Sequence, residues 1–282
     1  MQKPTPRLVA VHDLSCIGRC SLTVIMPVLA ALGVQVCPLP TAVLSTHLGG
    51  FREVAFCDFT NQMSKFYRHW QQEEIGFDCI YSGFLASCAQ IDTVLSFIDE
   101  FNENKPLVVV DPVMGDHGRL YSVYTPSMQE QMKKLVARAD IITPNYTEAC
   151  FLLGESYTAE GIDIDTARSW SRRLSEMGPG IVVITGLPTA ADRIVNLAYE
   201  RSTGKEWQTD NRYIPARYPG TGDIFASVIA GSLVQGRTMG VALKRAADFV
   251  GSCVARTHEA GTPSREGVLL ERCLPLLWDE DN

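Results

Sequence analysis

The feature that most constrains this chain is a repeated alternation of short β-branched runs with stretches of helical periodicity. The clearest runs are Leu107–Asp111 (LVVVD) and Ile181–Thr185 (IVVIT), which are typical of buried strands. Similar runs occur at Leu8–Val11, Val34–Pro40, Asp78–Ser82 and Ala139–Thr143. Strands that alternate with helices form a parallel sheet with helices on both faces, so the sequence predicts an α/β fold.

Apolar residues at helical spacing fill several intervals between these runs. A first helix is expected from Leu22, with Gly33 as its natural end and Pro27 as the site of a kink. Further helices are expected at Thr125–Arg138, Tyr146–Leu153, Thr166–Met177, Gly222–Gln235 and Met239–Arg256. An antiparallel pair of strands is expected at Arg193–Tyr199 and Glu206–Tyr213.

The composition favours one globular domain over residues 1–282, because no linker and no fixed-period repeat divides the chain. The 25 basic and 32 acidic residues give a net charge of −7, which argues against the basic face that nucleic-acid binding needs. No apolar run approaches the roughly 20 residues of a membrane span, and the N-terminus does not resemble a signal peptide. Nine scattered cysteines without a Cys-x-x-Cys pair favour a reducing, cytoplasmic location.

Ligands of an open parallel sheet bind outside the carboxyl ends of its strands, so the residues after each run are candidates for a site. They are His12 and Asp13, Thr41, Ser82 to Phe84, Asp111 to Asp116, Thr143 to Asn145, and Thr185 with Gly186. Each of them alone is an ordinary turn residue. Because the polar pattern recurs at five strands, the set favours a site.

The most informative segment is Gly220-Thr221-Gly222-Asp223, a glycine-rich turn that leads directly into an apolar helix. The unpaired N–H groups at such a helix start can hold an anion, and glycine lets the backbone approach it closely. An aspartate at this place could accept a proton from a substrate hydroxyl during phosphoryl transfer. The alternative is that Asp223 is an acid favoured only by the helix dipole.

Asn145 and Glu148 form a second constellation, three residues apart at a predicted helix start. Together with Asp111 and Asp116 they could supply oxygen ligands for Mg²⁺. The alternative is a capping box, in which Asn145 caps the helix and Glu148 reaches back. The two interpretations are compatible, since a capped helix start can also present an acid to a metal.

Several common motifs are missing from the sequence. It contains no P-loop, no Gly-x-Gly-x-x-Gly after the first strand, no His-Glu-x-x-His and no Gly-x-Ser-x-Gly. Cys16 and Cys20, four residues apart, could mark a reactive thiol, but small apolar fillers near a turn are the better interpretation.

Three motifs follow one another along the chain: Asp111-Pro-Val-Met-Gly-Asp116, Thr143-Pro-Asn-x-x-Glu148 and Gly220-Thr-Gly-Asp223. In this order and spacing they resemble the ribokinase-like superfamily, and the resemblance extends from Leu8 to about His258. Ser82-Gly83-Phe84 and the run from Leu39 to His47 resemble the vitamin B6 kinases in particular, which phosphorylate pyridoxal and pyridoxamine.

The resemblance implies a three-layer fold with a mostly parallel central sheet, flanking helices and small lid elements. It implies that Asp223 is the base acting on the 5′-hydroxymethyl group and that Gly220, Thr221 and Gly222 form an anion hole. The residues implied at the ATP phosphates and their cations are Asp111, Asp116, Thr143, Asn145, Glu148, Thr185 and Gly186. The residues implied at the substrate ring, besides Asp223, are Asp13, Thr41, His47 and Phe84.

The resemblance also implies ATP as co-substrate and Mg²⁺, which Glu148 and Asp111 would hold through water or phosphate. It leaves a monovalent cation such as K⁺ open, and its members are usually homodimers. The chain departs from the B6 kinases at Asp13, where serine is usual, and at Phe84, where tyrosine is common. An acid at position 13 suggests a preference for an amine-bearing ligand such as pyridoxamine.

Phosphorylation of a B6 vitamer is therefore the leading functional prediction. A kinase for hydroxymethylpyrimidine, which is a similar ring with a similar primary alcohol, is the nearest alternative. Sugar or nucleoside kinases of the same fold come next, and a non-catalytic protein that binds pyridoxal phosphate is an alternative of a different class. The complete Gly220–Asp223 turn speaks against a protein without catalysis.

Overall fold

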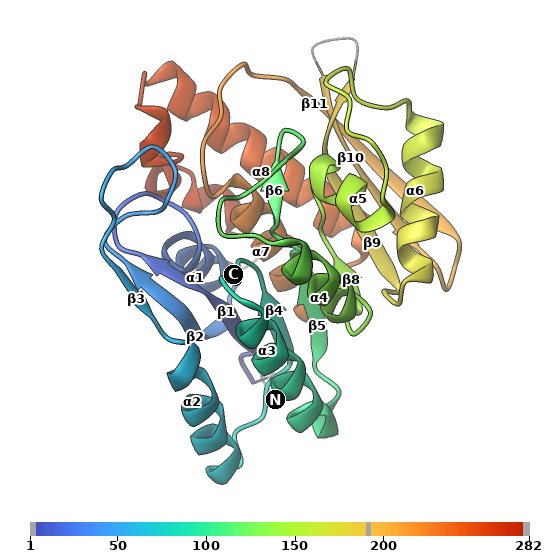
Figure 1. Cartoon of the computed structure of the whole chain (residues 1–282). Coiled ribbons are helices and arrows are strands. Elements are labelled where there is room, and N and C mark those ends of the chain that lie inside the picture. The colour runs from blue at the N-terminus through green and yellow to red at the C-terminus, as the bar shows by residue number, and fades with distance from the viewer. Residues whose placement is uncertain (1–3, 190–192, 279–282) are drawn as a thin grey trace.

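The computed structural model describes residues 4–189 and 193–278, so the predicted domain limits, 1 and 282, lie outside the described residues. A nine-stranded sheet runs through the molecule in the order β11-β10-β9-β8-β5-β4-β1-β2-β3 (Figure 1). The pairs among β2, β1, β4, β5, β8 and β9 are parallel. Antiparallel pairs add β3 at one edge and the β9–β10–β11 meander at the other.

The strands of the main sheet are β1 (Arg7–Ser15), β2 (Gln35–Leu44), β3 (Phe56–Asp58), β4 (Cys79–Ser82), β5 (Leu107–Val110), β8 (Ile141–Ile142), β9 (Ile181–Thr189), β10 (Arg193–Glu200) and β11 (Lys205–Arg212). A separate hairpin consists of β6 (Gly115–Asp116) and β7 (Arg119–Leu120).

The helices are α1 (Leu22–Ala31), α2 (Thr60–Gln72), α3 (Cys88–Glu100), α4 (Pro126–Val136), α5 (Tyr146–Leu153), α6 (Ile164–Glu176), α7 (Thr221–Val234) and α8 (Met239–Glu259). Short 3₁₀ turns are η1 (Asn102–Asn104), η2 (Ser264–Glu266), η3 (Leu270–Arg272) and η4 (Leu274–Leu277). None of the helices within the described ranges is long and apolar enough to cross a membrane.

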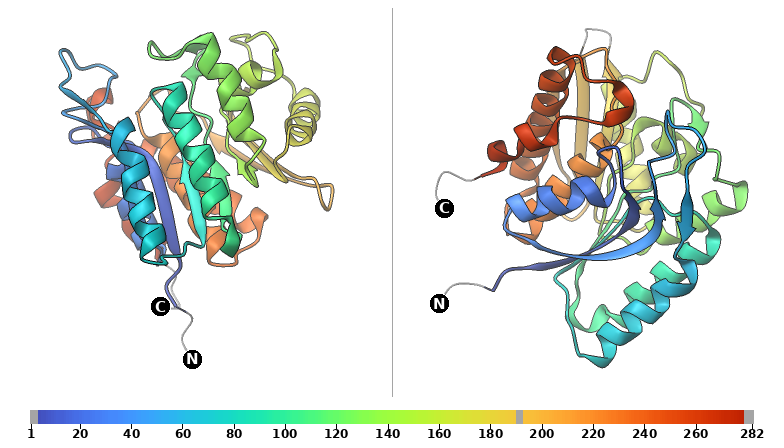
Figure 2. Two further views of the ribbon diagram at one scale, coloured as in Figure 1. Left: turned by 60° about the horizontal axis from the view of Figure 1, so that its bottom comes forward. Right: turned by 90° about the vertical axis from the view of Figure 1, so that its left-hand side faces the viewer.

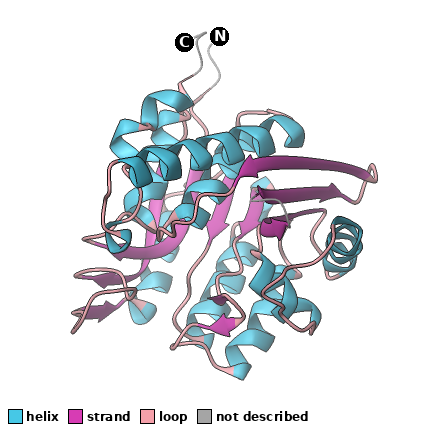
Figure 3. Cartoon of the chain, turned by 90° about the horizontal axis from the view of Figure 1, so that it is seen from above, coloured by secondary structure: helices cyan, strands magenta, loops and turns pink. Residues whose placement is uncertain are grey.

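Two hydrophobic cores lie on opposite faces of the sheet. Helices α2 to α6 pack over one face, and α1, α7, α8 and the C-terminal turns pack over the other. Figures 2 and 3 show the sheet as the middle of three layers. The predicted α/β fold with a mostly parallel sheet and helices on both faces is therefore confirmed.

Several predicted boundaries were wrong, and the first strand, predicted at Leu8–Val11, runs from Arg7 to Ser15. The second strand continues to Leu44, past the predicted end at Pro40, because β3 pairs with its last residues. The strand predicted at Ala139–Thr143 shortens to Ile141–Ile142. Helix α6 begins two residues before Thr166 because the Asp163 side chain accepts a hydrogen bond from the Thr166 N–H and caps the helix.

Candidate active site

The glycine-rich turn before α7 lies directly against the loop between β1 and α1. Gly220 has a φ of +82°, and a Cβ atom built on it would lie 2.1 Å from the carbonyl oxygen of Arg19. Only glycine fits there, because both the backbone conformation and the space exclude a side chain. The helix that follows starts at Thr221, so its first N–H groups have no partner within the helix and face the carboxyl edge of the sheet.

Asp223 lies in the first turn of α7 with 14% of its side chain exposed. Its Oδ2 accepts a hydrogen bond from the Ser21 N–H at 2.8 Å, and its Oδ1 lies 3.9 Å from His12 Nδ1. Burial raises the pKa of Asp223 to about 6, with a smaller increase from the charge of Asp13 and an opposing effect of the Ser21 N–H. A carboxylate with such a pKa is ionised at neutral pH and is a stronger base than an exposed aspartate.

Unpartnered polar atoms line the neighbouring strand ends. Both ring nitrogens of His12, the Thr41 hydroxyl and the Ser82 hydroxyl are buried without a hydrogen-bond partner among the described residues. Buried polar groups normally have partners, so each of these groups is a candidate contact for a polar ligand. The hydroxyl of the predicted site residue Thr41 is thus buried without a partner there, and so is that of Ser82.

His12 was one of the strand-end candidates but was given no role at the site, although it directly precedes Asp13 in β1. Its ring packs edge-on against Tyr81 at 4.4 Å, and a Cβ at Gly83 would lie 2.1 Å from it. Burial lowers the pKa of His12 to about 3, so the ring is neutral beside Asp223. The polar residue at a strand end was the only sequence signal for His12, and such residues also occur in ordinary turns.

His47 contacts three loop segments. Its Nδ1 accepts a hydrogen bond from the Gly49 N–H at 3.0 Å, and its Nε2 lies 2.6 Å from the Arg265 carbonyl oxygen. The ring also lies where a Cβ of Gly18 would stand, and it packs edge-on against Phe51. Both nitrogens of this predicted ring-binding residue are therefore engaged by the backbone.

Phe84, a further predicted ring-binding residue, follows β4 and is half-buried. Its ring centroid lies 6.4 Å from that of Tyr124, at a tilted angle. The side chain has no polar group, so the residue offers an apolar wall.

Asn145 and Glu148 form the predicted capping box at the start of α5. The Glu148 N–H donates to Asn145 Oδ1 at 2.9 Å, and Glu148 Oε2 accepts from the Asn145 N–H at 2.9 Å. The other oxygen, Oε1, accepts from the Met114 N–H at 3.1 Å. Glu148 is thereby fixed at the carboxyl edge, beside the loop that follows Asp111.

Asp111 and Glu148 are buried acids whose pKa values are both raised. Burial and the charge of Asp223 raise the pKa of Asp111 to about 8, while the Thr143 hydroxyl beside it acts in the opposite direction. Burial and the charge of Asp111 raise the pKa of Glu148 well above its usual range. A cation between these groups would relieve the repulsion, since an opposite charge favours the ionised forms.

The acidic residues fit Mg²⁺ only as a site that binds the ion through water or phosphate. No group of three His, Cys, Asp or Glu side chains within the described residues is arranged to hold a metal ion directly. Mg²⁺ usually keeps several waters and binds one or two carboxylates together with substrate phosphates. Asp111 and Glu148 therefore fit an ion held through water or phosphate and do not form a closed protein cage.

The remaining predicted nucleotide residues lie in two places. Thr185 forms a parallel bridge with Asn145, and its N–H donates to the Pro144 carbonyl at 2.9 Å, so Thr185 and Gly186 adjoin the capping box. Asp116 instead lies on the β6–β7 hairpin, 52% exposed, and contacts His117. Its charge still contributes to the raised pKa of Glu148.

Tyr121 was not predicted, yet its phenol lies within electrostatic reach of the whole acidic cluster. Although 42% of Tyr121 is exposed, partial burial of its phenol and then the charges of Glu148, Asp116, Asp223 and Asp111 raise its pKa. The Tyr121 N–H donates to the Met114 carbonyl at 2.9 Å. No sequence signal could have found it, because the hairpin that places it is too short to show a strand pattern.

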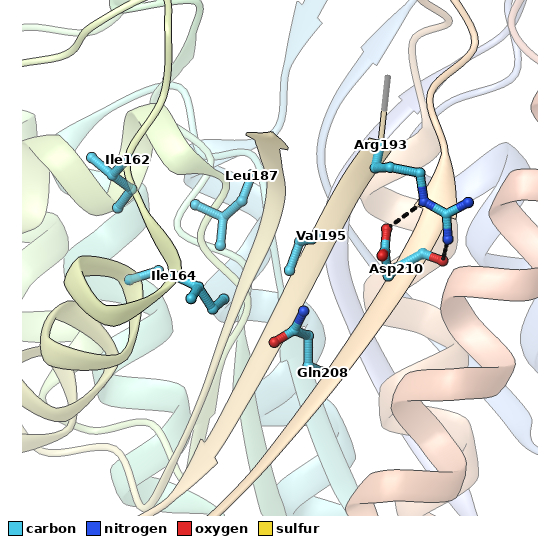
Figure 4. Close-up of a pocket in the computed structure, with 8 residues that line it drawn as sticks. Ile162, Ile164, Leu187, Arg193, Val195, Gln208 and Asp210 are labelled. Atoms are coloured by element: carbon cyan, nitrogen blue, oxygen red, sulfur yellow. Dashed lines mark hydrogen bonds and ion pairs between the residues drawn. The ribbon is translucent and has the colours of Figure 1, made fainter. Parts of the chain in front are cut away.

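A cavity of about 230 Å³ lies elsewhere, between α6 and strands β9 to β11 (Figure 4). Its walls are mainly apolar, with the Arg193–Asp210 ion pair at one side. None of its lining residues belongs to the predicted site, so it is separate from the acidic cluster.

The three-layer fold, together with acids at the carboxyl edge of the sheet, defines a kinase of the ribokinase-like superfamily. A family model described as phosphomethylpyrimidine kinase matches residues 28–267, so the chain belongs to that family.

Solved structures agree with this assignment. A Bacteroides thetaiotaomicron protein with the provisional name of phosphomethylpyrimidine kinase is 44% identical, with a TM-score of 0.93 over 98% of this chain and 96% of that one. A second crystal form of it, 43% identical to this chain with a TM-score of 0.92 over 97% and 96% of the chains, contains pyridoxal. Pyridoxal kinase from Lactobacillus plantarum is 32% identical, with a TM-score of 0.88 over 97% of each chain.

The match to one curated relative covers only part of both proteins. Pyridoxal kinase from Arabidopsis thaliana is 29% identical over 157 residues, which are 54% of this chain and 49% of that protein. The chain thus spans about half the length of this relative. The predicted resemblance to the vitamin B6 kinases is confirmed by these matches.

Proposed function

We propose that the protein transfers the γ-phosphoryl group of ATP to the 5′-hydroxymethyl group of a B6 vitamer, namely pyridoxal, pyridoxamine or pyridoxine. The observation that carries the proposal is Asp223, a partly buried carboxylate placed beside the free N–H groups of a glycine-rich helix start. The pyridoxal in the 43% identical Bacteroides protein supports the choice of a B6 vitamer.

In the proposed mechanism the substrate alcohol lies against Asp223, whose carboxylate accepts its proton as the oxygen attacks the γ-phosphorus. The N–H groups of the Gly220–Gly222 turn hold the charge on the transferred group, and ADP leaves. The vitamer ring would lie among Thr41, His47 and Phe84, with Asp13 close by. Phosphoryl transfer requires mainly positioning and charge compensation, and these groups can supply both.

The nucleotide would lie along the carboxyl edge, beside Asp111, Asp116, Thr143, Asn145, Glu148, Thr185 and Gly186. Mg²⁺, held by Asp111 and Glu148 through water or phosphate, would neutralise phosphate charge when bound. A monovalent cation such as K⁺, a homodimeric assembly and a cytoplasmic location remain parts of the proposal that follow from the resemblance alone.

A kinase for hydroxymethylpyrimidine is the second candidate, because the matching family model carries the name phosphomethylpyrimidine kinase. The decisive experiment assays pyridoxal, pyridoxamine, pyridoxine and hydroxymethylpyrimidine with Mg·ATP. We expect kcat/KM to be highest for one of the three B6 vitamers. A higher value for hydroxymethylpyrimidine would reject the B6 assignment, and vitamer binding without turnover would favour a non-catalytic protein.

The pH dependence of the reaction follows from the raised pKa of Asp223. The base acts when ionised, so kcat/KM for the vitamer should rise with pH through a midpoint near 6 and level off above it. Initial rates between pH 5 and 8 check this. A midpoint near 4, the ordinary value for aspartate, would mean that burial does not control this base.

A further inference from the structure

Ser21, at the N-cap position of α1, has a backbone conformation that serine rarely adopts. Its φ is 50° and its ψ is −137°. Positive φ is unfavourable for residues with a Cβ atom, and it persists only where surrounding contacts enforce it. Ser21 is therefore held in place by its neighbours.

Two hydrogen bonds hold Ser21 between two aspartates. The Ser21 hydroxyl donates to Asp13 Oδ1 at 2.6 Å, and the Ser21 N–H donates to Asp223 Oδ2 at 2.8 Å. The second oxygen of Asp13 accepts a bond from the Ser15 hydroxyl at 2.8 Å. A continuous chain of bonds thus runs from Asp13 through Ser21 to Asp223.

An irregularity in the sheet directs the Asp13 side chain toward Ser21. The register between β1 and β2 shifts between His12 and Leu14, so Asp13 lies in an irregularity of the strand. Such irregularities redirect a side chain out of the regular alternation. The Asp13 carboxylate is 5% exposed, and both of its oxygens accept hydrogen bonds from serine hydroxyls.

We propose that Asp13 is a positioning residue for the reaction: it fixes Ser21 so that the Ser21 N–H holds Asp223 in the orientation of a base. The inference rests on the proposed kinase function. One oxygen of Asp223 is then occupied by Ser21, and the other remains available on the side of His12. On this view the acid at position 13 does not select an amine-bearing vitamer.

The first test is Asp13→Asn, which keeps the shape of the side chain but removes its charge. We expect kcat to fall by about 10- to 100-fold, as for a misplaced catalytic group, with KM values for ATP and vitamer nearly unchanged. The factor should be the same for pyridoxal, pyridoxamine and pyridoxine. A changed ratio among the vitamers, or a loss confined to KM, would show that Asp13 contacts the ring and would overturn the proposal.

Substitutions of Ser21 distinguish loss of the Asp13–Ser21 hydrogen bond from loss of folding. Ser21→Gly removes the hydroxyl but adopts positive φ readily, so it should lose less kcat than Ser21→Ala. In the Ser21→Gly background Asp13→Asn should have little further effect on kcat, because the link is already absent. Full additivity of the two substitutions would overturn the proposal. Ser15→Ala is the matched control, since it removes a hydroxyl from the same carboxylate but leaves Ser21 bonded.

Hydrogen exchange tests the hydrogen bonds from Asp13 through Ser21 to Asp223 without an assay of activity. The Ser21 amide should be protected in the wild type and exchange faster in Asp13→Asn, while amides in the centre of the sheet stay unchanged. A wild type without kinase activity but with this coupled exchange would reject the proposed function and retain the positional link. Unchanged exchange at Ser21 would reject the link.

Discussion

Asp223→Ala is expected to lower kcat for vitamer phosphorylation by about 10³- to 10⁴-fold, the upper range for loss of a general base. The Kd for ATP should change little, because the residues proposed to bind the nucleotide lie on the β5, β8 and β9 side of the site. Rapid-quench or steady-state assays give kcat, and calorimetry gives the Kd. Retention of near-full turnover would remove Asp223 from the role of base.

The thermal stability of this variant separates loss of the base from misfolding. The pKa of Asp223 is raised in the folded protein, so its ionised form opposes folding above about pH 6. Asp223→Ala should therefore melt at the wild-type temperature or above it at pH 8. Asp248→Ala, which removes one partner of the exposed Lys244–Asp248 pair on α8, is the matched control and should leave kcat unchanged.

Asp223 and the capping box could be predicted because their signals are local. A glycine-rich turn before an apolar helix and an Asn-x-x-Glu pair are each contained within a few residues. The repeated strands likewise predicted a parallel sheet. The order of the strands and the edge strand β3 could not be predicted, because pairing partners far apart in the chain decide them.

The contacts around Asp223 could not be predicted, because they join distant segments. Ser21 and Asp223 are 202 positions apart, and the hydrogen bond between them exists only in the folded chain. The sequence predicted that Asp13 lies at the site but not that two serine hydroxyls occupy its carboxylate. Helix α2 was missed because most of its positions are polar, Phe66 is exposed, and Met63 and Tyr67 are the residues that it buries.

Gly220→Ala should be the most damaging single-methyl change at the site. The new Cβ would lie 2.1 Å from the Arg19 carbonyl oxygen, which belongs to the backbone and can move only if the β1–α1 loop moves. That loop also carries Ser21, so the change should displace Asp223 and the anion hole together. A displacement of about 1 Å in a catalytic group can cost on the order of 100-fold, and we expect at least this loss in kcat/KM.

Gly236→Ala is the control for the cost of placing a side chain at positive φ. Gly236 has a φ of +83°, but no atom lies within 4 Å of the position that a Cβ would take. Gly236→Ala therefore isolates the conformational cost of about 1–2 kcal/mol, and it should leave kcat/KM unchanged.

A Gly222→Ala variant distinguishes obstruction of the proposed anion hole from loss of folding stability. Only Asp111 Oδ2, at 3.9 Å, lies near its added Cβ, so Gly222 should accept alanine without loss of stability, because alanine favours a helix by about 1 kcal/mol over glycine. The methyl would nevertheless stand at the start of α7, where the transferred phosphoryl group must approach the backbone. We therefore expect Gly222→Ala to lower kcat/KM while its melting temperature is kept, and Gly220→Ala to lower both. Wild-type kinetics in both variants would show that the phosphoryl group does not bind at this turn.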